Sequence, residues 1–264
     1  MATDLRVHVE TSELNASQVA ARTRLIYNTM LRESPHFDGG NFATIHSSDL
    51  KRLFHQYDTS FFKAQIGATL GRTPLHFRLS KRMTRSAGQT ARFTPANRSG
   101  RRFYEISVSM TLLFQCFAGD DHRPITATGL ECHDRMEALQ RVMEHELVHL
   151  IEVLLWTTSS CSVRRFQSIA LRFFGHTTHT HELITPAERA FSEFGIKPGD
   201  SVRFHFKGGD YTGLVNRVTK RATVLVQDTR GRRHSDGNRY STFYIPVESL
   251  KALRRAKQTG SDAR

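Results

Sequence analysis

The sequence predicts an α+β protein, in which helices and a few strands are followed by a smaller all-β region. Residues 16–31 and 50–62 carry apolar side chains at helical spacing. Between residues 75 and 109 apolar and polar residues alternate, which predicts a small three-stranded sheet arranged as a meander. From about residue 198 to 250, short alternating stretches are separated by Gly-Gly-Asp and Thr-Lys-Arg turns, and they predict five short strands.

These patterns divide the chain into four parts. We expect an N-terminal helical extension over residues 1–48 and a main domain over 49–185. Pro186 to Pro198 is expected to be a connecting segment. The strands of 198–250 resemble a small β-barrel of the SH3 or KOW kind. Residues 251–264 form a basic tail that we expect to be flexible.

A helix of about twenty residues is predicted after Asp134. Asp134 followed by Glu137 is the pattern of a capping box. The helix should end at Trp156, where a Thr/Ser-rich loop begins. Its apolar positions are Met136, Leu139, Val142, Met143, Leu147, Leu150, Ile151, Leu154 and Leu155. Such a stripe predicts a core helix that could hold functional side chains rigidly.

This helix contains the pattern His-Glu-x-x-His at His145, Glu146 and His149. A separation of four residues places both imidazoles on one face of a helix, where they can share one zinc ion. Glu146 can then serve as general base for a water molecule without binding the metal itself. Glu152 lies on the same stripe and is either a carboxylate that orients an imidazole or a solvated charge.

Composition limits the classes of protein. No apolar run approaches 18 residues, and Met1 to Glu10 does not have the pattern of a signal peptide. The three cysteines, Cys116, Cys132 and Cys161, are odd in number and widely spaced, which favours free thiols or a metal ligand in a reducing cytoplasm. We therefore expect a cytoplasmic protein without a membrane partner. No Gly-x-Gly-x-x-Gly or phosphate-binding loop is present.

The charge of the chain favours a polyanionic partner. A net charge of +13 and a pI near 10.2 favour nucleic acid through release of counterions. Basic residues are interspersed with Tyr240 and Tyr244 in the C-terminal region, a mixture that suits single-strand or backbone binding. A docking or purely structural barrel is the alternative, and the basic loop Thr94 to Arg102 is either a contact or a solvated turn. The candidate contacts are Arg217, Lys220, Arg221, Arg232 and Arg233.

Residues 50–182 resemble the SprT-like family of zinc metallopeptidase domains. The resemblance rests on Leu79 to Gly88 (Leu-Ser-Lys-Arg-Met-Thr-Arg-Ser-Ala-Gly), on the strand Tyr104 to Ser109, and on His145 to Leu150. It covers about half of the chain and implies a zincin-like fold, bound Zn²⁺ and a protein substrate. Characterised members include DNA-dependent proteases, so the resemblance favours DNA over RNA as the polyanion.

The chain departs from the family at the third zinc ligand. The family supplies a histidine about a dozen residues after the motif, but the corresponding stretch here, Ser160 to Phe166, contains none. Cys161 is nearest in register, and a thiolate is a competent zinc ligand. His176 and His181 are the rivals, because the loop that carries them could fold back over the site.

Two functions of different classes follow. The first is a zinc metalloendopeptidase in which Glu146 activates water at a metal held by His145, His149 and Cys161 or His176. The second is a non-enzymatic nucleic-acid-binding protein with a closed, structural zinc site. The presence of Glu146 favours the enzyme, since a structural site needs no base there. The motif alone does not exclude a metal-dependent hydrolase of small molecules.

Overall fold

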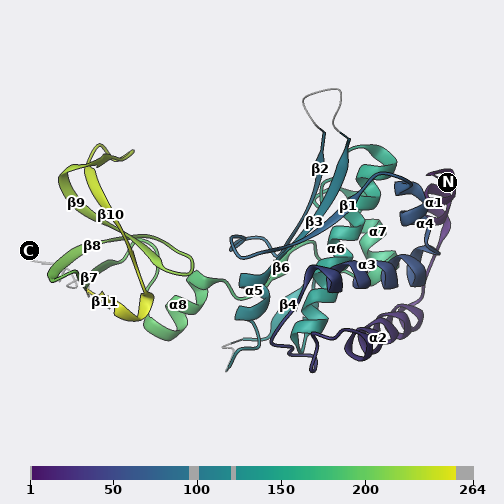
Figure 1. Ribbon diagram of the computed structural model, residues 1–264, viewed down its shortest axis with the longest axis horizontal. Coiled ribbons are helices and arrows are strands. Elements are labelled where there is room, and N and C mark those ends of the chain that lie inside the picture. Colours follow the sequence, from purple (N-terminus) through teal and green to yellow (C-terminus); the bar gives the residue numbers. More distant parts are fainter. Residues whose placement is uncertain (1, 95–100, 120–122, 254–264) are drawn as a thin grey trace, which may run out of the picture. The chain divides into compact units, whose positions relative to one another are not determined.

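A computed structural model describes residues 2–94, 101–119 and 123–253 of the chain (Figure 1). It forms two compact units, Met1–Ile184 and Thr185–Arg264, which are described separately. Helices and strands are both abundant, so the predicted α+β class is confirmed. In the described part of the chain, no helix combines the length and apolar character that crossing a membrane requires.

The first unit contains seven helices among its described residues. They are α1 (Ala2–Thr11), α2 (Ala16–Glu33), α3 (Ser47–Phe62), α4 (Gln65–Leu70), α5 (Met110–Gln115), α6 (Arg135–Trp156) and α7 (Arg164–Phe174). Sequence analysis missed α1, which buries Leu5 and Val9. Asn15 begins α2 with a complete capping box to Gln18. Residues of α1 and α2 belong to the same hydrophobic core as α3 and α6.

The main sheet consists of β1 (Leu75–Ser80), β2 (Gly88–Phe93) and β3 (Phe103–Ser109), in the order β1-β3-β2. The predicted three strands are present, but the predicted meander is wrong. Strand β3 lies in the centre, parallel to β1 and antiparallel to β2. The connection from β1 to β2 passes the end of β3, where Ser109 donates hydrogen bonds from its main chain to Ala87 O and from its side chain to Met83 O. This connection is too long for a tight hairpin and leaves β2 as an edge strand.

A second, smaller sheet was not predicted. It consists of β4 (Ile125–Ala127), β5 (Leu130–Cys132) and β6 (His181–Glu182), in the order β5-β4-β6. Ala127 pairs with His181 in this sheet. The pairing holds the segment that follows α7 close to α6, which also contacts β4 and β5.

Helix α6 lies in the interior of the first unit, with α3 and α7 beside it (Figure 1). Asp134 caps it by accepting a hydrogen bond from Glu137 N at 2.9 Å. The reciprocal bond of the expected capping box is shifted by one residue, because the Glu137 carboxylate accepts from His133 N. Most side chains of α6 are buried, including the polar ones that carry the site.

The second unit contains α8 (Pro186–Phe194) and five strands. They are β7 (Ser201–Phe206), β8 (Gly209–Val218), β9 (Ala222–Arg233), β10 (Arg239–Ile245) and β11 (Lys251–Ala252), in the order β10-β9-β8-β7-β11. All pairs are antiparallel. Four strands, β7 to β10, lie within the predicted range 198–250, and the fifth, β11, lies just beyond it in the predicted tail. The strands form an open sheet, and residues 185–253 show no closed barrel.

The expectation of a connecting segment over Pro186 to Pro198 is wrong for most of its length, because α8 occupies it. Thr185 forms a capping box with Glu188, and Pro186 occupies the first turn, where its missing N–H costs nothing. Of the predicted basic loop, residues 95–100 lie outside the described residues. The same holds for residues 254–264 of the predicted flexible tail, while Lys251 and Ala252 pair with β7.

Candidate metal centre

The two histidines of the motif face each other from adjacent turns of α6. Their Nε2 atoms are 3.1 Å apart, and both rings pack against Phe166 of α7. Two imidazole nitrogens on one tetrahedral zinc ion, each bound at about 2.0–2.1 Å, stand about 3.3 Å apart. The two rings therefore already have the spacing that a shared ion requires.

The proton of His149 can be assigned from its hydrogen bonds. Glu152 is completely buried, and its Oε2 accepts from the Ser159 hydroxyl at 2.6 Å. An ionised carboxylate only accepts hydrogen bonds, so the Ser159 hydroxyl must donate to it. The same hydroxyl lies 2.7 Å from His149 Nδ1 and accepts there, which places the ring proton on Nδ1. In the neutral ring, Nε2 then presents its lone pair to His145.

Of the two expectations for Glu152, a carboxylate that orients an imidazole or a solvated charge, the structure agrees with the first. The Nε atom of Arg165 donates to Glu152 Oε1 at 2.6 Å, and the guanidinium of Arg165 lies 4.5 Å from the centre of the Trp156 ring. These contacts join the end of α6, the following loop and the start of α7. They fix the imidazole of His149 by the arrangement that metal-binding histidines commonly show.

Cys161 lies beside the two motif histidines. The ligand atoms of His145, His149 and Cys161 all lie within 4.8 Å of one another. Among the described residues, these three side chains form the one cluster that could hold a metal ion. Cys161 is half-buried, and its thiol is free. Nitrogen and sulfur donors in this number fit zinc.

His181 approaches the same cluster from β6. Its ring centre is 4.6 Å from that of His145. Its Nε2 is buried and makes no hydrogen bond within the described part of the chain. Burial lowers the pKa of His181 to about 4, with smaller effects of His176 and His149, and the main chain of Arg141 opposes the shift. A neutral imidazole with an unused, buried nitrogen is a candidate ligand.

His176 belongs to a different hydrogen-bonded cluster, centred on Glu144. Its Nε2 is 2.8 Å from Glu144 Oε2, and the ring is fully buried. Glu144 also accepts from the Tyr57 hydroxyl at 2.6 Å and pairs with Arg141 at 2.8 Å. His176 therefore has the Glu144 carboxylate as its partner, and the structure does not bring it to the motif histidines.

Glu146 is buried between α6 and the edge strand β2. Thr90 Oγ1 lies 2.8 Å from Glu146 Oε2 and 3.0 Å from the main-chain oxygen of Glu146. A Cβ atom at Gly88 would lie 2.5 Å from Glu146 Oε1, so the carboxylate occupies space that only glycine leaves free. Burial raises the pKa of Glu146 to about 8, and the hydrogen bond from Thr90 opposes the shift.

A cleft of about 540 Å³ joins these side chains. It is lined by β2 and the segment before it, by His145, Glu146 and His149, and by both Cys161 and His181. A protein-bound ion, the candidate base and a polypeptide could therefore meet in one solvent-accessible space.

The five candidate nucleic-acid contacts are exposed and lie in the second unit, but the structure does not gather them into one patch. Arg217 is on β8, Lys220 and Arg221 follow it, and Arg232 and Arg233 end β9. From Arg221 to Arg232 the distance along the strand is about 36 Å. The structure thus separates them into two groups at opposite ends of β9.

Ser159, Thr90 and Gly88 were missed by sequence analysis. Ser159 lies in the Thr/Ser-rich loop after the motif helix, where its ten-residue distance from His149 gives no periodic signal. Gly88 ends the stretch that carries the resemblance, but nothing in the sequence indicates its contact with Glu146; it is the first residue of β2.

No protein-family model matches this chain, and no curated protein or solved structure is significantly similar to it.

Proposed function

We propose that the protein is a zinc-dependent endopeptidase with a SprT-like, zincin-like first unit. The observation that supports this most directly is the pair of facing Nε2 atoms, 3.1 Å apart, with the proton of His149 held away from the pair by Ser159. Without a metal, the Nε2–H of His145 can donate to this lone pair, so an N–H···N hydrogen bond and a shared cation both produce the spacing. The Cys161 sulfur beside the pair and the Glu146 carboxylate in the same cleft favour the cation, because a hydrogen-bonded pair of imidazoles needs neither.

Zinc bound there would polarise a scissile carbonyl and lower the pKa of a water molecule. The chain supplies the remaining functions. Glu146 takes the proton from the attacking water and later delivers it to the leaving amine, as a general base and acid. Thr90 holds the Glu146 carboxylate at the wall of the cleft, and Glu152 with Ser159 keeps the His149 ring oriented.

We further propose Cys161 as the third ligand, because its sulfur lies with both motif nitrogens in one compact group. His181 is the rival, because its buried Nε2 lacks a partner among the described residues. A site that used both would have four protein ligands, and this arrangement favours the second candidate function, a nucleic-acid-binding protein with a structural zinc site.

Cobalt substitution should decide between the ligands. We expect the Co²⁺ form to show a sulfur-to-cobalt charge-transfer band that Cys161→Ser abolishes. Cys161→Ser should also weaken zinc binding by more than the roughly 10–100-fold that loss of a ligand's hydrogen-bond partner costs. His181→Ala is measured in parallel by metal titration, and Cys132→Ala serves as the control for a buried thiol outside the cluster.

The outcomes separate the two functions. A cobalt spectrum without a sulfur band, together with loss of metal from His181→Ala alone, would replace Cys161 by His181 in the site. If Cys161→Ser and His181→Ala each weaken metal binding, both side chains are ligands. The site then has four protein ligands and is closed, and the structural function is favoured. A protein that binds neither zinc nor cobalt would contradict the metallopeptidase proposal.

We also propose that the second unit binds nucleic acid, with DNA preferred, so that the protease acts on proteins associated with it. The support is a row of directly paired residues on one face of the sheet. Arg217 pairs with Thr223, which pairs with Tyr244, and Tyr244 is 59% exposed. Two strand spacings of about 4.8 Å separate an exposed aromatic ring from a cation, which suits a base and its phosphate.

Fluorescence anisotropy with a labelled single-stranded oligonucleotide tests this partner. We expect Arg217→Gln to reduce the slope of log K against log salt by about one, because one phosphate contact is lost. Arg32→Gln removes an exposed arginine of the first unit and should leave the slope unchanged. Equal slopes for wild type and Arg217→Gln would exclude this row as the contact.

A further inference from the structure

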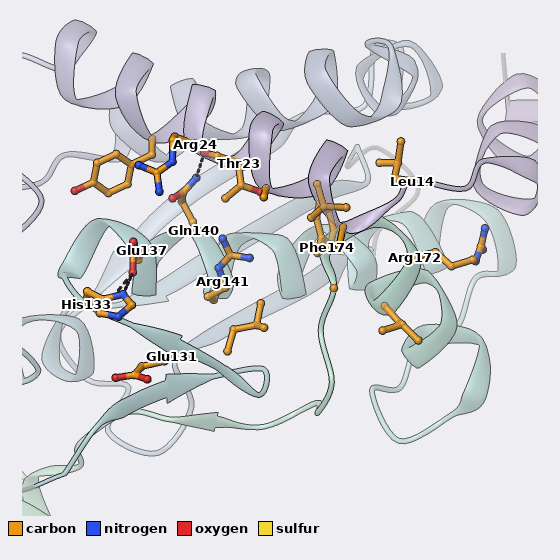
Figure 2. A pocket seen from close by; sticks show the side chains of 17 residues that line it. Leu14, Thr23, Arg24, Glu131, His133, Glu137, Gln140, Arg141, Arg172 and Phe174 are labelled. Atoms are coloured by element: carbon orange, nitrogen blue, oxygen red, sulfur yellow. Dashed lines mark hydrogen bonds and ion pairs between the residues drawn. The ribbon is translucent and has the colours of Figure 1, made fainter.

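A second pocket of the first unit has no role in the proposed function. It has a volume of about 880 Å³ and lies between α2, β5, the first half of α6 and the end of α7 (Figure 2). It shares no lining residue with the cleft of the candidate metal centre. Its volume is within the range of about 300–1,000 Å³ that is typical of small-molecule sites.

One end of the pocket is polar and the other is mainly apolar. Figure 2 shows Arg24, Gln140 and Arg141 toward one end and Leu14 and Phe174 toward the other. Arg172 also lies at the second end, where its guanidinium donates to the main-chain oxygens of Val9 and Ser12. Further apolar side chains of the lining are Val19, Leu130 and Leu171. Leu171 is 55% exposed although it belongs to a helix whose other apolar face is buried. A lining of this kind suits a molecule with an apolar body and one polar group.

Most charges at the polar end are already matched. Arg141 pairs with the buried Glu144, and the Glu137 carboxylate accepts two hydrogen bonds from His133. The exposed guanidinium of Arg24, in contrast, forms no ion pair with any residue that the structure describes. It is a cation that still lacks a counterion at the pocket.

A second observation also concerns an unused polar group. The Thr23 side chain lines the pocket, one position before Arg24 on α2. The residue is 9% exposed, and its buried Oγ1 has no hydrogen-bond partner in residues 2–94, 101–119 and 123–253. A buried hydroxyl without a partner costs free energy. This oxygen is closed to solvent, so a ligand acceptor in the pocket reaches it only after the Thr23 side chain rotates.

We propose that this pocket binds an amphipathic carboxylate of medium chain length. The carboxylate lies against Arg24 and Thr23, and the hydrocarbon body lies along Leu14, Leu171 and Phe174. An exposed carboxylate, Glu131, also belongs to the lining, so the sign of the ligand's charge is the point that an experiment must test.

Isothermal titration of the full-length protein with decanoate tests the proposal. We expect decanoate to bind, decanol to bind more weakly, and decyltrimethylammonium not to bind in the pocket. Arg24→Gln should weaken decanoate by about tenfold to a hundredfold, as expected for a lost hydrogen bond to a charged group. Ala20→Phe, on the pocket-facing side of α2, should fill the space and abolish binding. Arg32→Gln on the same helix is the matched control.

Three results would overturn the assignment. They are no detectable binding of decanoate, equal binding of the three probes, and decanoate binding that neither Arg24→Gln nor Ala20→Phe changes. Thermal unfolding of each variant without ligand shows whether the fold is retained. Thr23→Val keeps the shape of the side chain and should weaken decanoate less than Arg24→Gln does.

Discussion

Replacing Glu146 by glutamine should reduce the turnover number for a protein substrate by about 10²–10⁴-fold, the usual contribution of a general base. Glutamine has nearly the same shape and can keep the contact with Thr90, but it cannot take a proton from water. His145 and His149 are unchanged, so zinc should be retained. The measurement combines the rate of cleavage of an unstructured protein with zinc content on the same sample.

The matched control is Glu137→Gln, which removes a carboxylate from the same helix outside the cleft. It should cleave at the wild-type rate. Proteolysis by Glu146→Gln at the wild-type rate would contradict the role proposed for Glu146. Loss of zinc together with activity would instead mean that Glu146 maintains the site and would leave its role as base without support.

Removing the carboxylate of Glu144 should destabilise the protein by about 3–5 kcal/mol, the cost of breaking a buried ion pair by deletion of one partner. Glu144 is fully buried and contacts Arg141, His176 and the Tyr57 hydroxyl. Glu144→Ala removes the carboxylate that all three contact. Burial, with the nearby Glu144 carboxylate, raises the pKa of Tyr57 well above its ordinary value, so the phenol stays protonated and donates.

Denaturant unfolding of the metal-free protein measures this effect. Tyr57→Phe removes the hydrogen bond donated to Glu144 and the one accepted from Gln140, and should cost about 2–3 kcal/mol. This smaller change keeps the prediction testable if Glu144→Ala does not fold. Glu33→Ala removes a carboxylate from an exposed pair with Arg52 and should change stability by less than about 1 kcal/mol. A loss for Glu144→Ala no larger than that for Glu33→Ala would show that the cluster does not stabilise the fold.

Helices and strands that are specified by a pattern of neighbouring residues could be predicted from the sequence. The apolar stripe and the Asp134 cap predicted α6 closely, and the alternating residues predicted β3. The order β1-β3-β2 was not predictable in the same way, because pairing depends on where the connection 81–87 packs. The helix α8 could have been predicted, since Thr185, Pro186 and Glu188 form a recognisable start.

The site was predictable only where one helix carries it. His145, Glu146 and His149 follow from helical spacing, and their geometry agrees with it. Ser159 and His181 come from other segments, and their approach depends on tertiary packing of α7 and β6. His176 was a plausible ligand by sequence position, but the buried carboxylate of Glu144 competes for it. Spacing along the chain does not reveal such competition.

The close approach of Gly88 to Glu146 makes a residue without a side chain part of the chemical environment of the candidate base. The carboxylate lies against the main chain of β2, and a methyl group at position 88 would displace it from that position. The orientation of Glu146 is thus set by an absence of atoms on a neighbouring strand as well as by the Thr90 hydroxyl. Variation at position 88 would therefore tune the reactivity of this carboxylate without touching any group that can gain or lose a proton.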